Sequence, residues 1–104
     1  MNQKILIIVP ACNEQANIQR TIKEIRALPM KLDVIVIDDG STDLTAQEAK
    51  DAGAGVISLP FNLGIGGAVQ TGFQFAFQRG YDIAVQVDGD GQHDAAYLPI
   101  ILGP

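Results

Sequence analysis

Two acidic clusters, Ile37–Asp43 and Asp88–Asp94, each come directly after an apolar run that is typical of a buried strand. In an open parallel α/β sheet, ligands bind at the carboxyl ends of the strands, so both clusters stand where a binding site is expected. Carboxylates gathered there repel one another unless a cation or hydrogen-bond donors offset their charge. The clusters therefore predict a site for a divalent metal and for a ligand that the metal bridges, with a phosphorylated ligand as the first hypothesis.

The second cluster has the pattern of a shared metal site. Asp88, Asp90 and Gln92 offer oxygen side chains at alternating positions, and Mg²⁺ and Mn²⁺ take oxygen ligands while keeping positions for water and substrate phosphate. The alternative is an exposed turn rich in Asp and Gly. A calcium-binding EF-hand loop is excluded, because its sixth and twelfth positions require Gly and Glu, whereas this chain has His93 and Pro99 there.

The first cluster places two adjacent carboxylates between a strand and a helix. Asp38 or Asp39 could accept an N–H group from a base, at a helix N-terminus that favours anions. The alternative is an ordinary helix cap with an Asx-type turn, for which Ser41 would suffice. Because two aspartates exceed what capping needs, we expect at least one of them to contact a ligand.

A glycine-rich segment, Asn62–Gly67, follows the third predicted strand. It matches neither the GxGxxG dinucleotide fingerprint nor the P-loop, which requires a Lys. Close packing of a helix on the sheet explains its glycines at least as well as phosphate binding does. The single cysteine, Cys12, lies in the first strand-to-helix turn, and we interpret it as a small lining residue rather than a nucleophile.

The order of the predicted elements is βαβαβαβ. Apolar runs predict strands at 5–9, 32–37, 56–59 and 81–87, and helical periodicity predicts helices at 14–28, about 41–52 and about 68–79. Asn13 is the expected cap of the first helix and Ser41 or Thr42 of the second, while Gly53 and Gly80 end the second and third helices. Because each crossover is a helix, we predict a Rossmann-like, open, mainly parallel α/β sheet. Residues 99–102 begin a further element.

Composition narrows the class of protein. The 104 residues suffice for one domain, and the net charge of −5 argues against nucleic acid as a partner. One cysteine is typical of a reducing compartment. The N-terminus shows no secretory signal, and no run approaches the length of a membrane span. These features predict a cytoplasmic protein.

Four stretches together resemble the inverting family 2 glycosyltransferases of GT-A fold, especially the polyprenyl-phosphate sugar transferase branch. They are Val9–Glu14, Val36–Asp43, Asn62–Ala68 and Asp88–His93, in the order and spacing of that family. The resemblance implies nucleotide-binding roles for Pro10, Cys12, Glu14, Asp39, Asp88 and Gly89, with Asp39 facing the base. It also implies that Asp88, Asp90 and Gln92 hold Mn²⁺ or Mg²⁺ on the nucleotide diphosphate. Two departures are Cys12, where the family usually has Tyr, and Ile65, where many members have Lys.

The resemblance also implies a reaction, in which a sugar passes from a UDP- or GDP-type donor to an acceptor such as a polyprenyl phosphate. Residues 1–104 would be the nucleotide-sugar-binding part of the enzyme, with the catalytic base beyond Pro104. We expect this fragment alone to be inactive, and to form a homodimer through a surface that truncation leaves uncovered. The full-length protein would act at the cytoplasmic face of the membrane.

The alternative is a non-catalytic metal- and nucleotide-binding module. A downstream coding sequence with an acidic catalytic motif would favour the enzyme. A sugar-phosphate nucleotidyltransferase is disfavoured, because Pro10–Glu14 contains neither the Gly nor the Arg of its signature. A receiver domain is disfavoured as well, because its acidic pair should follow the first strand.

Overall fold

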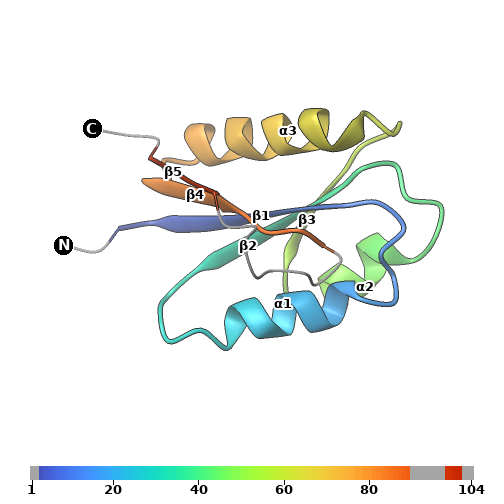
Figure 1. The fold of residues 1–104 in the computed structure, drawn as a ribbon, viewed down its shortest axis with the longest axis horizontal. Coiled ribbons are helices and arrows are strands. Elements are labelled where there is room, and N and C mark those ends of the chain that lie inside the picture. Colours follow the sequence, from blue (N-terminus) through green and yellow to red (C-terminus); the bar gives the residue numbers. More distant parts are fainter. Residues whose placement is uncertain (1–2, 90–97, 102–104) are drawn as a thin grey trace.

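The computed structural model describes residues 3–89 and 98–101. They form a layered α/β structure in which helices cover both faces of one five-stranded sheet (Figure 1). The strands are β1 (Ile5–Ala11), β2 (Asp33–Asp38), β3 (Gly55–Ser58), β4 (Ile83–Gln86) and β5 (Leu98–Ile101), and the helices are α1 (Ile18–Arg26), α2 (Thr45–Asp51) and α3 (Gly64–Gln78).

The strand order is β3-β2-β1-β4-β5, with β1 at the centre. The first four strands are parallel, which confirms the predicted βαβαβαβ order, whereas β5 pairs antiparallel with β4. The further element expected at residues 99–102 is this edge strand. Because β1 and β2 pair up to Ala11 opposite Asp38, their carboxyl ends finish level with each other. The loops that follow both strands therefore begin at the same edge of the sheet.

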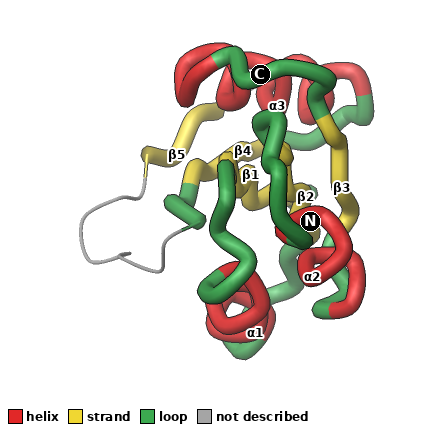
Figure 2. The backbone as a smooth tube through the Cα atoms, turned by 90° about the vertical axis from the view of Figure 1, so that its right-hand side faces the viewer, coloured by secondary structure: helices red, strands yellow, loops and turns green. Residues whose placement is uncertain are grey.

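Each face of the sheet has its own apolar core, because alternate side chains of a strand point to opposite faces. On one face, α1 and α2 pack on side chains such as Val9 and Val36; on the other, α3 packs on side chains such as Ile8 and Ile37. Figure 2 shows α3 separated by the strands from α1 and α2. All four of these strand side chains are fully buried.

Helices α1 and α2 begin later than the sequence predicts, and α3 begins earlier. Helix α1 begins at Ile18, so Asn13 is not its cap and Glu14 precedes it. Helix α2 begins at Thr45, so neither Ser41 nor Thr42 is the cap. Helix α3 already begins inside the predicted glycine-rich loop, at Gly64. None of the three cap residues makes a side-chain capping hydrogen bond.

The predicted helix ends are closer to the structure. Gly53 (φ +92°) and Gly80 (φ +75°) adopt the left-handed backbone just after α2 and α3, as a glycine stop requires. Helix α1 ends at Arg26, two residues before the predicted end at residue 28.

Candidate functional site

A pocket of about 220 Å³ lies where the carboxyl ends of β1 and β2 meet the start of α3. Its lining comes from three segments: the end of β1 and the turn after it, the residue after β2, and the end of the loop before α3 together with the start of that helix. The lining residues are Pro10, Ala11, Cys12, Asp39, Asn62, Gly64, Ile65 and Ala68. The structure thus brings three of the predicted nucleotide-binding residues, Pro10, Cys12 and Asp39, into one cavity.

Asp39 joins the three walls of this pocket. Its side chain is only 4% exposed, and its two carboxylate oxygens accept backbone N–H groups from Leu63 at 2.7 Å and Gly64 at 2.9 Å. Its own backbone N–H donates to the carbonyl of Ala11 over 2.8 Å. A carboxylate offers about four acceptor positions, so Asp39 retains capacity for an N–H group of a ligand in the pocket.

Gly40 lets the loop before α3 approach this closely. It has φ +69°, and a Cβ atom built on it would lie 2.7 Å from the backbone nitrogen of Asn62 and 2.8 Å from the carbonyl carbon of Phe61. A side chain there would collide with backbone that cannot move aside. Gly40 is therefore required for the contact of Asp39 with the start of α3.

Asn62 is a pocket residue that the sequence did not single out. Its side-chain Nδ2 donates to Sγ of Cys12 over 3.2 Å, and its Oδ1 accepts the N–H of Gly64 at 3.0 Å. Ala11, Gly64, Ile65 and Ala68 also line the pocket; the sequence placed them in the stretches Val9–Glu14 and Asn62–Ala68 without predicting that they line it. The available signal was their place after a parallel strand, because every such strand ends at the same edge of the sheet.

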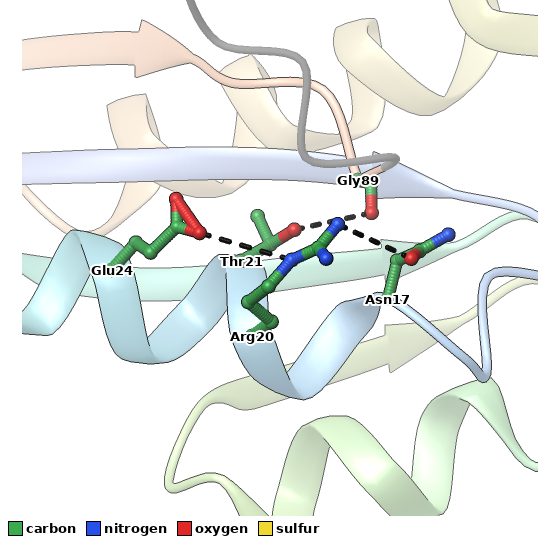
Figure 3. A network of polar contacts seen from close by, with 5 residues as sticks. All are labelled: Asn17, Arg20, Thr21, Glu24 and Gly89. Carbon is green, nitrogen blue, oxygen red and sulfur yellow. Dashed lines mark hydrogen bonds and ion pairs between the residues drawn. The ribbon is translucent and has the colours of Figure 1, made fainter.

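The second acidic cluster begins beside the pocket. Gly89 is buried, and a Cβ atom on it would lie 3.0 Å from Cβ of Ala11 and 3.1 Å from the carbonyl oxygen of Pro10. Its carbonyl accepts the hydroxyl of Thr21 on α1 at 3.3 Å (Figure 3). Because position 89 of the cluster carries no side chain, the start of the cluster can lie directly against Pro10 and Ala11.

Asp88 is the described member of the predicted metal-binding set, since Asp90 and Gln92 lie outside the described residues. Its carboxylate is half-buried, and within residues 3–89 and 98–101 it receives one long hydrogen bond, 3.5 Å from Nε2 of Gln86. No group of three or more His, Cys, Asp or Glu side chains that could hold a metal occurs in that part of the chain. A half-buried carboxylate with unused oxygens fits a hard divalent cation.

Asp38 and Glu14 use their carboxylates within the described structure. Asp38 accepts the N–H of Ser41 at 3.1 Å and the hydroxyl of Ser58 at 3.2 Å. This is the turn role considered for the cluster, and not a helix cap, because α2 begins only at Thr45. Glu14 accepts Nδ2 of Asn17 at 3.2 Å and does not line the pocket. Of the two adjacent aspartates, Asp39 is the one at the cavity.

Asp43, in the first acidic cluster, has a shifted pKa. A hydrogen bond from the Thr45 side chain, opposed in part by desolvation and aided by backbone N–H groups, holds the pKa of Asp43 below its usual 3.8. Asp43 also accepts the N–H of Gln15 at 3.2 Å. Its charge is therefore satisfied by Thr45 at the start of α2 and by Gln15 in the turn that follows β1.

Within residues 3–89 and 98–101, none of the helices has the length and apolar character needed to cross a bilayer.

The chain was compared with known proteins and matches the model of glycosyl transferase family 2 over residues 6–104. Undecaprenyl-phosphate mannosyltransferase from Micrococcus luteus is 35% identical over 104 residues, which cover 95% of this chain and 43% of that protein. Protein RfbJ from Shigella flexneri is 39% identical over 98 residues, which cover 94% of this chain and 73% of that protein. The chain spans only 43% of the Micrococcus luteus protein and 40% of polyprenol monophosphomannose synthase from Mycolicibacterium smegmatis, so both are much longer than the chain. RfbJ is the shorter relative.

Solved structures share the fold. A mannosyltransferase from Pyrobaculum calidifontis in complex with GDP-Man and Mn²⁺ superposes with a TM-score of 0.74 at 23% identity, over 86% of this chain and 28% of that one. Glucosyl-3-phosphoglycerate synthase from Mycobacterium tuberculosis, in complex with Mn²⁺, UDP and glucosyl-3-phosphoglycerate, gives 0.71 at 30% identity, over 85% and 34%. Because the family model matches nearly the whole chain, this chain belongs to glycosyltransferase family 2 and has a GT-A-like α/β fold.

Proposed function

We propose that the chain binds a nucleotide diphosphate sugar of UDP or GDP type in the pocket at the carboxyl ends of β1 and β2. The observation that carries this proposal is the position of Asp39: a nearly buried carboxylate that lines the cavity and retains acceptor capacity. Pro10 and Cys12 line the same pocket, and Asp39 accepts an N–H group of the base. Family membership and relatives solved with GDP-Man or UDP support this assignment.

In this proposal the diphosphate lies toward Asp88 and Gly89, because Gly89 adjoins Pro10 and Ala11. Asp88, Asp90 and Gln92 would hold Mn²⁺ or Mg²⁺ there, and the metal would neutralise the charge that develops on the departing diphosphate. Relatives solved with Mn²⁺ or Mg²⁺ and a nucleotide support this choice of metal. Glu14 is kept as a nucleotide-binding residue that acts from outside the pocket lining.

The acceptor is proposed to be a polyprenyl phosphate, because the relative from Micrococcus luteus is an undecaprenyl-phosphate mannosyltransferase. Its phosphate oxygen attacks the anomeric carbon of the sugar with inversion, and the nucleoside diphosphate leaves. The reaction then takes place at the cytoplasmic face of the membrane. The catalytic base is placed beyond Pro104, in the part of those longer relatives that this chain does not match.

Calorimetric titration of UDP and GDP, with and without MnCl₂, tests the donor site. Asp88→Asn and Asp90→Ala are expected to abolish the gain in nucleotide affinity that Mn²⁺ provides. Asp51→Asn, which makes the same change of charge on the exposed end of α2, should retain that gain. Equal metal dependence in all four proteins would contradict the assignment.

Asp39→Ala tests the base contact in the same titration. Loss of a hydrogen bond to a charged acceptor should weaken nucleotide binding by about 1.5–3 kcal/mol. Unchanged affinity would remove Asp39 from the proposed contact.

A transfer assay tests whether this chain alone can transfer a sugar. With several nucleotide sugars and polyprenyl phosphate, the 104-residue chain should give no product above background, and light scattering should show a dimer or larger species. Measurable turnover would show that the chain contains the catalytic base.

A further inference from the structure

Asn13 has an unusual backbone conformation directly beside the pocket. Among the described residues it is the one non-glycine residue with positive φ, at +55°. Asn tolerates the left-handed region better than most residues, but the conformation still needs support from its surroundings. Asn13 follows Cys12, which lines the pocket, and its side chain is exposed. Burial of the side chain therefore does not provide that support.

Hydrogen bonds to the turn after β2 provide it instead. The backbone N–H of Asn13 donates to Oγ of Ser41 over 2.9 Å. Its side-chain Oδ1 accepts the backbone N–H of Thr42 at 2.8 Å and the hydroxyl of Thr42 at 3.3 Å. Asn13 is thus fixed to the segment that begins immediately after Asp39 and Gly40.

The neighbours of Asn13 extend this connection. The backbone N–H of Glu14 donates to the Thr45 side chain at 3.0 Å, and Oε1 of Gln15 accepts the N–H of Leu44 at 3.1 Å. We call the contacts between residues 13–15 and 41–45 the polar clasp. Residues 12–17 contribute no side chain to either apolar core. The clasp, rather than apolar packing, therefore determines where this turn lies.

We propose that Asn13 is a positioning residue that holds the Cys12 wall of the pocket at a fixed distance from Asp39. Only the identity of the ligand, a nucleotide, rests on the proposed function. The positioning role concerns the placement of Cys12 relative to Asp39 and does not depend on which ligand binds. Asn13 touches neither wall through its side chain. It acts by keeping the turn after β1 in its left-handed form and attached to the turn after β2, so that the cavity has its bound shape before a nucleotide enters.

Three variants separate the two properties of Asn13. Asn13→Asp keeps an acceptor for the Thr42 N–H and tolerates positive φ. Asn13→Gly keeps the backbone conformation and removes the acceptor, and Asn13→Ala removes both. Gln47→Ala is the control, because it removes a side-chain hydrogen bond of 2.9 Å to Asp51 on the exposed side of α2. All five proteins are measured well below their melting temperatures.

The first readout is the affinity for UDP and GDP in the presence of MnCl₂. Asn13→Gly and Asn13→Ala should weaken binding by about fivefold or more, as the loss of one or two hydrogen bonds that preorganise the pocket implies. Asn13→Asp and Gln47→Ala should stay within about twofold of the parent chain. Parent-like binding by Asn13→Gly would overturn the proposal, and so would failure of Asn13→Asp to restore binding.

The second readout needs no nucleotide. Cys12 is the one cysteine of the chain, so the rate of thiol alkylation reports the position of that wall. Asn13→Gly and Asn13→Ala should change this rate by about threefold or more, with Asn13→Asp and Gln47→Ala near the parent rate. If the parent chain bound no nucleotide but the rates changed, the proposed function would fail and the positioning role would stand. Unchanged rates would overturn the positioning role itself.

Discussion

Replacement of Asp39 should destabilise the fold as well as weaken ligand binding, because this carboxylate, directly after β2, caps the N-terminus of α3. Helix α3 has no side-chain cap from its own cap residue, Leu63. Its first free N–H groups are satisfied by Asp39, at 2.7 Å to Leu63 and 2.9 Å to Gly64. A negative charge at the N-terminus of a helix also interacts favourably with the helix dipole.

The size of the effect follows from what each donor retains in Asp39→Ala. Gly64 keeps a second acceptor, Oδ1 of Asn62 at 3.0 Å, whereas no other acceptor for the Leu63 N–H is seen in the described structure. One hydrogen bond to a charged group and the helix-dipole term together amount to about 2–3 kcal/mol of unfolding free energy. For a chain of this size, that corresponds to a decrease in melting temperature on the order of 10–20 °C.

Urea unfolding followed by far-ultraviolet circular dichroism measures this change. Asp39→Asn should lose nearly as much as Asp39→Ala, because its NH₂ group would face one of the two N–H donors. Asn62→Ala is the control, since it removes the second acceptor of Gly64 and leaves Asp39 in place. If both Asp39 variants unfolded within about 0.5 kcal/mol of the parent chain, the capping role would be refuted.

Three further predictions concern other parts of the fold. Gly72→Ala should lower the free energy of unfolding in urea, because about 1–3 kcal/mol of overpacking exceeds what the helix gains from Ala. Its Cβ would collide with the Cγ2 methyl of Ile8 on β1; a more stable variant would contradict this. In the folded chain the pKa of Asp43 lies below 3.8, chiefly because of the hydrogen bond from the Thr45 hydroxyl. The ionised carboxylate therefore stabilises the fold above pH 3.8, and this stabilisation is lost as the pH falls further. Asp43→Asn should therefore flatten the acid side of the curve of unfolding free energy against pH. Burial, and then the hydrogen bond to Asp33, raise the pKa of Tyr81 to about 12. The neutral phenol therefore stabilises the fold fully below pH 10, and this stabilisation is lost as the pH rises through about 12. Phenolate absorbance should show one tyrosine that titrates late, and its titration should shift to lower pH in Asp33→Asn.

The sequence predicted the sheet better than the helix starts, for one physical reason. Apolar periodicity located the first four strands within one or two residues, since burial between two layers of helices leaves a local signature. The helix starts depend on partners that are distant in sequence. Asn13 has a positive φ, and its N–H and that of Glu14 donate to the side chains of Ser41 and Thr45, so the chain forms a turn before α1 begins at Ile18. Helix α3 begins at Gly64, where Asp39 accepts its first N–H groups. No local pattern encodes such contacts.

The candidate site was predicted in part for the same reason. Cys12 and Asp39 stand in motifs that adjoin strands, and both line the pocket. Asn62 was not singled out, because its contribution arises where the loop before α3 crosses Gly40. That crossing depends on a glycine whose importance appears only once β2 and the loop are placed side by side.

The central position of β1 has a consequence for synthesis of the chain on the ribosome. β1, β2 and β3 emerge first with α1 and α2, so one face of the early sheet can be covered at once. The opposite face, with Leu6, Ile8 and Ile37, has no cover until α3 is complete, and β1 has an unpaired edge until β4 follows. A half-made chain therefore exposes an apolar surface and a strand edge together, the two features that favour aggregation. Nascent chains that stop before α3 should depend on chaperones, whereas chains that extend past β4 should not.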